Sequence, residues 1–291
     1  MKKLLSILIA VLMVATFAVG CGTTDNGDNG DNGDNGATYA DGVYFAQEDE
    51  FASSGYKYFV VITVEGGEIT DAHWGGTNLK PVGNKKTFSA EGNYPMVERG
   101  GAAAEWDVQA AAAEAWLIEN QDPAAFDDLY TSEEGYTDAL ETDDGTQVSI
   151  HVIEFFELAK TALAGTPVAA GDYETPEDYV VNAVIESDGD WNNVAEFIVV
   201  NGTIVSANYN ATSNVEDQPL SKKELGADYG MVERGGASAE WYEQAESVEA
   251  FVLETQGFDI EFDADGKTDA IAGVTITANY FQELFEMALG Q

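Results

Sequence analysis

The chain contains the same segment twice. The stretch Met96 to Trp106, MVERGGAAAEW, returns as Met231 to Trp241, MVERGGASAEW, with one alanine replaced by serine. A Thr-Asp-Ala triplet and a closing amphipathic segment follow each copy, so the similarity extends over whole domains. A near-identity of this length does not arise by chance. The chain is therefore a tandem duplication.

The first residues have the pattern of a bacterial lipoprotein signal peptide. Two lysines precede an uncharged apolar run, residues 4–19, which ends at Gly20-Cys21. A membrane-spanning helix that stays in place needs about 20 apolar residues, and this run is shorter. The sequence predicts that residues 1–20 are removed and that Cys21 is lipidated, which places the protein on the extracytoplasmic face of the cell membrane.

The next segment, residues 21–38, contains four Asp-Asn-Gly triplets and has almost no apolar group to bury. Such a composition predicts a flexible tether. Calcium binding is the alternative, because Asp and Asn oxygens are suitable ligands. An EF-hand loop, however, needs ligands at alternate positions and a closing glutamate, and a triplet period supplies neither.

Charge and residue inventory exclude several classes of function. The sequence has 12 Lys and Arg against 53 Asp and Glu, a net charge of −41, which excludes nucleic acid as a natural partner. Cys21 is the only cysteine, and neither His73 nor His151 has a histidine counterpart in the other copy. The sequence therefore predicts no metal site, no disulfide and no catalytic group.

Each copy is predicted to be an α+β domain in which an antiparallel hairpin packs with helices and a C-terminal helix closes the unit. The domains are expected at residues 39–165 and 177–291, joined by a linker at 166–176. The predicted strands are residues 39–44, 56–64 and 69–74 in the first copy, and 180–185, 196–200 and 204–209 in the second. The predicted helices are residues 102–120 and 237–256, followed by closing helices near 155–163 and 281–289.

The duplicated segment carries the only two arginines, Arg99 and Arg234, each beside a Gly-Gly pair. A guanidinium next to flexible backbone can hold a phosphate or a carboxylate. The alternative is that each arginine pairs with acidic neighbours or caps backbone carbonyls. The tryptophans that end the segment, Trp106 and Trp241, are predicted to be core residues rather than a flavin-stacking surface.

The segment Asp269-Ala-Ile-Ala272-Gly273-Val274-Thr275 resembles the Asp-x-x-Ser/Thr-Gly-Ala-Thr signature of the FMN-binding domain family. That family includes the flavin-carrying subunits of sodium-pumping NADH:quinone reductase and Rnf complexes, and flavinylated lipoproteins of extracellular electron transfer. In these proteins a flavin transferase joins the phosphate of FMN to the final threonine hydroxyl. The resemblance therefore implies FMN on the second domain, covalently attached through Thr275.

The residue types of this turn suit such a site. Gly273 permits close approach of backbone and cofactor, and the N-terminus of the following helix is expected to favour an anion. Arg234 is a further candidate contact of the cofactor. Two residues depart from the signature, because Ala272 replaces Ser/Thr and Val274 replaces Ala, and these changes are expected to weaken recognition by the transferase.

The first copy is expected to have a degenerate site. Ser149 takes the place of Thr275 and Gln147 the place of Gly273, and residues 141–145 form an insertion. Without the glycine, the first domain is expected to carry no flavin.

Two functions are consistent with the sequence. The first is a membrane-anchored extracytoplasmic flavoprotein that carries electrons through FMN and turns over no substrate of its own. Its partners would be the membrane, through Cys21, a flavin transferase and a redox partner that the sequence does not name. The alternative is a surface lipoprotein whose flavin-free, FMN-binding-like domains have a binding or structural role.

Cys21→Ser is expected to release the protein from membranes, because the substitution removes the thiol that would be lipidated. Fractionation of expressing cells, with detection in the membrane and soluble fractions, measures the change. Unchanged membrane retention of the variant would show that Cys21 is not the point of attachment.

Overall fold

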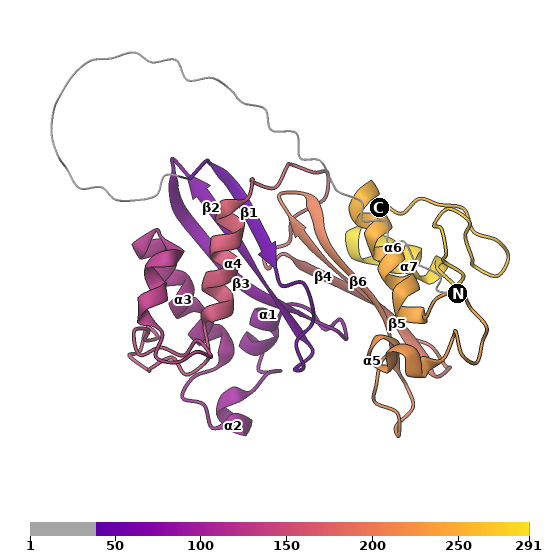
Figure 1. The fold of residues 1–291 in the computed structure, drawn as a ribbon, viewed down its shortest axis with the longest axis horizontal. Coiled ribbons are helices and arrows are strands. Elements are labelled where there is room, and N and C mark those ends of the chain that lie inside the picture. Colours follow the sequence, from indigo (N-terminus) through magenta and orange to yellow (C-terminus); the bar gives the residue numbers. More distant parts are fainter. Residues whose placement is uncertain (1–38, 291) are drawn as a thin grey trace, which may run out of the picture. The chain divides into compact units, whose positions relative to one another are not determined.

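The computed structural model describes residues 39–290, so the signal peptide, Cys21 and the whole tether lie outside the described part. Two three-stranded antiparallel sheets, with strand orders β1-β2-β3 and β4-β5-β6, each pack against helices of their own repeat (Figure 1). The predicted α+β class is confirmed. Between residues 39 and 290 no helix is both long and apolar enough to span a membrane.

The fourth strand, Val180–Ile185, lies where it was predicted, whereas most of the others extend beyond the apolar runs that predicted them. In the second repeat the central strand begins five residues before the predicted 196–200, because the polar residues Asn192 and Asn193 interrupt the apolar pattern at its start. The first strand lies three residues later than expected. The observed strands are β1 Gly42–Gln47, β2 Tyr56–Glu65, β3 Glu68–Asn78, β4 Val180–Ile185, β5 Trp191–Val200 and β6 Thr203–Ser213.

The hairpins β2–β3 and β5–β6 each turn through two residues with positive φ. Gly66 and Gly67 have φ of 64° and 85°, and Asn201 and Gly202 have φ of 50° and 77°. Two successive left-handed residues give a type I′ turn, whose twist matches that of the strands, and the Asn-Gly sequence of the second turn favours this conformation. The register shifts at equivalent places, between Thr63 and Val64 and between Ile198 and Val199.

The long helices begin later than predicted, at the tryptophan of each copy. Glu105 and Glu240, the residues just before these helices, have extended backbone with ψ of 161° and 163°. This extended geometry separates each helix from the turn that precedes it. Short helices were missed because too few residues define a period. The helices are α1 Lys85–Ala90, α2 Met96–Gly100, α3 Trp106–Asn120, α4 Ile153–Ala164, α5 Lys222–Leu225, α6 Trp241–Thr255 and α7 Asn279–Leu289, with 3-10 turns at Pro123–Leu129 and Gly226–Tyr229.

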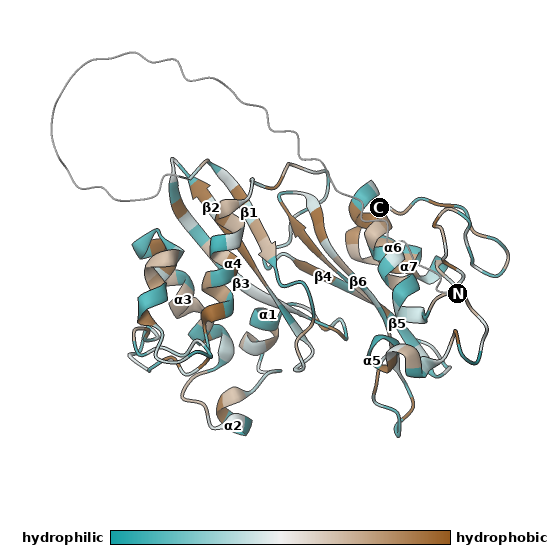
Figure 2. Cartoon of the chain, in the orientation of Figure 1, coloured by the Kyte–Doolittle hydropathy of each residue, from teal (hydrophilic) through white to brown (hydrophobic). Residues whose placement is uncertain are grey.

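Each repeat has a hydrophobic core between its sheet and its helices. Trp74 and Phe155 are fully buried in the first core, and Tyr209 and Phe281 occupy the second. Figure 2 shows the hydrophobic residues along the strands of both sheets, with hydrophilic residues on the outer parts of the helices. The predicted core position of the two repeated tryptophans is confirmed, since Trp106 and Trp241 are 2% and 4% exposed.

A third core joins the two repeats. Phe59 and Val61 of β2 are buried together with Val180, Ile198 and Val200 of β4 and β5. These residues lie on the opposite strand faces from those that meet the helices. The central strands β2 and β5 are therefore buried on both faces, which explains why their sequences read as continuous apolar runs.

Ile198→Ala is expected to lower the free energy of unfolding by about 2–5 kcal/mol, because it leaves a cavity in the shared core. Hydrogen exchange followed by mass spectrometry should show faster exchange in β2 as well as in β5. Val184→Ala, at a position on β4 that is 39% exposed, is the control and should change stability by less than about 0.5 kcal/mol. Faster exchange confined to the second repeat would contradict a shared core.

Candidate functional site

The first repeat holds a lysine inside a group of aromatic rings, which we call the first aromatic cage. The Nζ atom of Lys85 lies 4.4 Å from the ring centroid of Tyr56, 4.7 Å from those of Tyr58 and Tyr94, and 4.8 Å from that of Trp106. The ammonium donates to the Tyr58 hydroxyl at 2.6 Å, and the lysine is only 3% exposed. Cation–π attraction therefore holds the start of α1 against the sheet and α3.

The second repeat has the equivalent cage around Lys222. Its Nζ atom lies 5.3 Å from the ring of Trp191, 5.0 Å from Tyr229 and 5.1 Å from Trp241. Loss of water on burial lowers the pKa of Lys85 to about 7 and that of Lys222 to about 8. The cation inside each cage is thus a lysine of the protein itself.

The lysine that follows each caged lysine pairs with a buried glutamate. Lys86 contacts Glu114 Oε1 at 2.7 Å, and the same oxygen accepts the backbone N–H of Trp74 at 2.6 Å. In the second repeat Lys223 and Glu249 form the equivalent pair at 2.7 Å. Sequence reasoning missed these sites. The Lys-Lys pair that precedes each copy of the repeated segment, Lys85-Lys86 and Lys222-Lys223, is the sequence feature that could have indicated them.

The repeated segment itself forms a closed backbone turn. Glu105 accepts the backbone N–H of Met96 at 2.6 Å and of Val97 at 3.3 Å, and Glu240 makes the corresponding bonds at 2.9 and 3.2 Å. Gly101 and the equivalent glycine of the second copy have φ of 68° and 71°, a conformation that favours glycine. The near-identity of the two copies therefore preserves a turn and a helix start.

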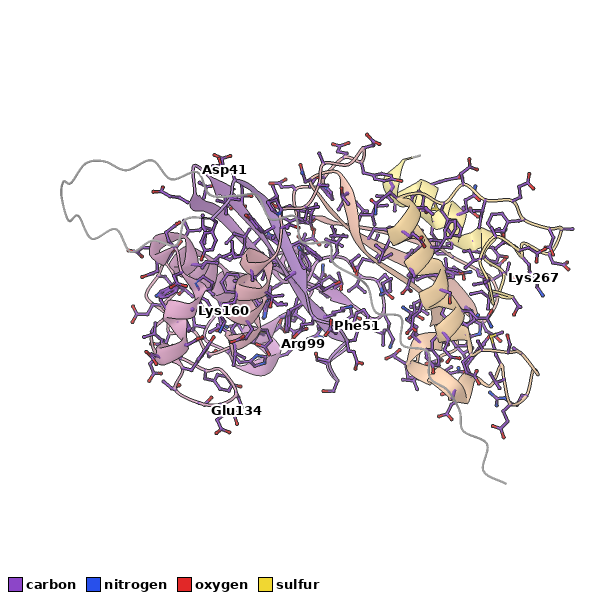
Figure 3. All side chains as sticks on the ribbon, turned by 45° about the horizontal axis from the view of Figure 1, so that its top comes forward. Asp41, Phe51, Arg99, Glu134, Lys160 and Lys267 are labelled. Carbon is purple, nitrogen blue, oxygen red and sulfur yellow. The ribbon has the colours of Figure 1, made fainter. Side chains whose placement is uncertain are left out.

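The two arginines of the segment lie at the surface. Arg234 donates through Nη2 to the backbone carbonyls of Asp228 and Tyr229, both at 2.6 Å. This is the carbonyl-capping arrangement that the sequence left open as the alternative to ligand contact. Arg99 is exposed at the equivalent position (Figure 3).

The predicted attachment residue, Thr275, is exposed on the turn before α7 and is held by a single glutamine. Gln244 Oε1 accepts the backbone N–H of Thr275 at 2.6 Å, its hydroxyl at 3.2 Å and the N–H of Ile276 at 3.1 Å. The amide of the same glutamine donates to the carbonyl of Ala239 at 2.9 Å. We call this arrangement the glutamine clamp.

The rest of the predicted motif divides between surface and core. Gly273 has φ of 81°, and a side chain built there would meet no atom of the described residues within 4 Å. Asp269 and Ala272 are also exposed, whereas Val274 is buried, 5% exposed. Val274 therefore contributes to the core below the turn and does not face a ligand on its surface.

The start of α7 does not offer its amides to Thr275, contrary to the expectation of an anion-binding helix N-terminus. The helix begins four residues later, at Asn279. The backbone N–H groups of Ala278 and Asn279 already donate to the carbonyl of Gly266, at 2.8 and 3.2 Å. A phosphate at Thr275 would have to find its donors elsewhere.

The first repeat has the same clamp on the serine that aligns with Thr275. Gln109 Oε1 accepts the N–H of Ser149 at 2.7 Å, its hydroxyl at 3.2 Å and the N–H of Ile150 at 3.2 Å. Gln147, in the position of the glycine, donates to the carbonyl of Leu140 at 2.6 Å. The insertion thus pairs with the segment just before Ser149 through a β-bridge between Glu141 and Gln147, while Gln147 and Ser149 stay exposed.

A cavity of about 590 Å³ lies beside the second-repeat motif and includes Thr268 and Asp269 in its wall. Its other residues include Phe262 and the one basic group, Lys267, which projects from the loop before α7 (Figure 3). Across residues 39–290, no three His, Cys, Asp or Glu side chains are grouped as a metal site would require.

Comparison with known proteins gives no family. No model of a known protein family matches the chain, and no curated protein matches it. The chain is similar to a protein from Clostridium thermocellum solved by NMR, with 41% identity over 44% of this chain and 94% of that one, at a TM-score of 0.32. It is also similar to a crystal structure of a protein from Clostridium perfringens, with 21% identity over 43% and 87%, at a TM-score of 0.31.

The caged lysine predicts a pH dependence of stability. The pKa of Lys85 in the fold, about 7, is below its ordinary value of 10.5, so between these values the unfolded chain binds more protons. The contribution of Lys85 to the free energy of unfolding should therefore rise with pH across this window. Urea unfolding of wild type and Lys85→Met should give a difference that grows with pH, whereas exposed Lys267→Met should not. A pH-independent difference for Lys85→Met would contradict the lowered pKa.

Proposed function

We propose that the protein is a membrane-anchored electron carrier of the extracytoplasmic surface, with FMN joined through its phosphate to the hydroxyl of Thr275. One observation carries the proposal. In the second repeat the hydroxyl is exposed on a clamped turn, two residues after a left-handed glycine above which the space is open.

The residues of the turn fit a bulky phosphoester. The side chain of Thr275 is exposed, and the open space above Gly273 leaves room for a transferase and for the attached group. The neighbouring acidic groups oppose a phosphate, and Lys267 is the basic side chain in the adjacent cavity wall that can offset them. Arg234 could contribute only by leaving the carbonyls that it caps.

The glutamine clamp has a defined part in this proposal. Because Gln244 Oε1 accepts two backbone N–H groups and the hydroxyl, it fixes the direction in which the Thr275 oxygen faces solvent. Gln244 is itself only 1% exposed, so the Thr275 hydroxyl is anchored to a residue of the core. Bound FMN would supply one- and two-electron chemistry, and the chain would supply attachment, orientation and reach from the membrane.

The first repeat supports the assignment by contrast. Ser149 has the same clamp, but Gln147 stands where the second repeat has Gly273, and it is tied to the insertion by a β-bridge between residues 141 and 147. We therefore assign the flavin to the second repeat alone. The alternative, a flavin-free lipoprotein with a binding role, is favoured by Ala272, which removes the hydroxyl that the family signature has at this position.

Co-expression with an exported flavin transferase should give a protein whose flavin fluorescence survives denaturing gel electrophoresis, because a phosphoester persists after unfolding. Thr275→Ala should abolish the fluorescence, and Ser149→Ala should leave it unchanged. Intact mass spectrometry measures the adduct directly. Absence of an FMN adduct in the wild type, and also in the Ala272→Ser, Val274→Ala protein, would refute covalent loading.

The clamp offers a matched pair of variants. Gln244→Met and Gln109→Met each leave buried backbone N–H groups without their acceptor, and each should cost about 1–3 kcal/mol of stability. Only Gln244→Met should lower FMN loading, since it alone frees the Thr275 turn. Equal loading of the two variants, measured by absorbance per folded protein, would show that orientation of Thr275 is not needed.

A further inference from the structure

A second cavity, of about 540 Å³, lies between the two repeats and is distinct from the Thr275 turn. Its walls come from both: Phe51 and Lys57 belong to the first repeat, and Lys223 and Tyr242 to the second. Phe51 is labelled in Figure 3. The volume is in the range of small-molecule sites, and the cavity requires both repeats to be in place.

A buried carboxyl group lines this cavity. Glu196 is 1% exposed, and its Oε2 atom accepts the backbone N–H of Gly83 at 2.9 Å. Its Oε1 atom is buried and has no hydrogen-bond partner within residues 39–290. The equivalent position in the first repeat is Val61, so the second repeat has a polar group where the duplication has an apolar one. An unsatisfied buried oxygen is costly, which indicates a role beyond packing.

Burial raises the pKa of Glu196 to about 8, so at neutral pH the group is a carboxylic acid with an O–H to donate. A neutral carboxylic acid can donate a hydrogen bond to an anionic oxygen, whereas an ionised carboxylate can only accept hydrogen bonds.

The cavity also contains a lysine with no ion pair. Lys57 is half-buried, and in the described part of the chain its ammonium makes no salt bridge, while its Nζ lies 5.6 Å from the ring centroid of Phe51. Lys223, by contrast, already contacts Glu249 and Asn208. The carboxylates of Glu249, Asp49 and Glu48 act on this ammonium electrostatically, but none of them is within ion-pair distance, so the Lys57 ammonium is free to bind an anionic ligand directly.

Exposed carboxylates line the same cavity. Asp49, Glu50 and Glu246 line the cavity and are exposed. A ligand that places an anionic group beside Lys57 would therefore have carboxylates available for a second, cationic group.

We propose that this cavity binds a small zwitterion of the size of an amino acid or dipeptide. Its carboxylate binds the Lys57 ammonium and Glu196, and its ammonium binds the exposed carboxylates of the lining, Asp49, Glu50 and Glu246. The assignment is independent of flavin on Thr275, because the two sites share no residue.

Dialanine is the probe, titrated into the folded protein and followed by NMR. The backbone amide of Gly83, bonded to Glu196, and the side-chain resonances of Lys57 should shift with a saturating dependence on concentration. Lys57→Met should abolish the shifts. Lys267→Met, which removes an exposed lysine outside the cavity, should leave them unchanged. Glu196→Gln, which keeps a donor, should retain binding, and Glu196→Val, which restores the residue type of the first repeat, should lose it.

Thermal unfolding of each variant shows that it is folded, so that loss of the shifts reports on the site. Acetate and ethylamine, each offering one end of the probe, should bind at least tenfold more weakly than dialanine. Equal binding of acetate and dialanine would overturn the zwitterion assignment. Absence of saturable shifts in wild type, or equal shifts in Lys57→Met, would overturn the site.

Discussion

The interaction on which each repeat depends is a buried lysine–glutamate pair beside the sheet. Glu114 and Glu249 are 6% and 9% exposed, and each binds a lysine and a strand N–H together. A buried carboxylate without its lysine would be strongly destabilising. The pair therefore fixes the short helix that carries the lysine, and this places the preceding residue, Lys85 or Lys222, in its aromatic cage.

One helix in each repeat organises all of these features. In the second repeat, α6 supplies Trp241 to the cage, Gln244 to the clamp and Glu249 to the ion pair, and α3 supplies the three equivalent residues in the first. The Thr275 turn is therefore connected through α6 to the cage and to the sheet. This connection gives the proposed attachment site a rigid support, although the turn itself is at the surface.

The two copies have diverged where they meet and where they would bind a ligand. The change from Val61 to Glu196 introduces a polar group next to the shared core, and the insertion at 141–145 adds a β-bridge beside the turn of the first repeat. The helix face, the cages and the clamps are retained in both. Duplication has thus preserved the parts that stabilise each unit and altered those that distinguish one surface from the other.

The sequence by itself determined the duplication, the α+β class and the core position of Trp106 and Trp241, because near-identity and short-range periodicity are local signals. It also aligned Ser149 with Thr275, and the clamps place the two residues equivalently. The lipid anchor, the flavin and the partners remain predictions.

Only the tertiary structure decided which residues meet across the chain. The glutamine clamp joins positions 31 residues apart, and the bond from Gly83 to Glu196 spans 113 residues, so no local pattern could indicate either. The tertiary structure also decided what the first amides of α7 bind. The carbonyl of Gly266 accepts the N–H groups of Ala278 and Asn279, whereas the sequence predicted that this end of the helix would favour an anion. Burial of Lys57, Lys85 and Glu196 depends on the same long-range packing, since desolvation is set by neighbours in space.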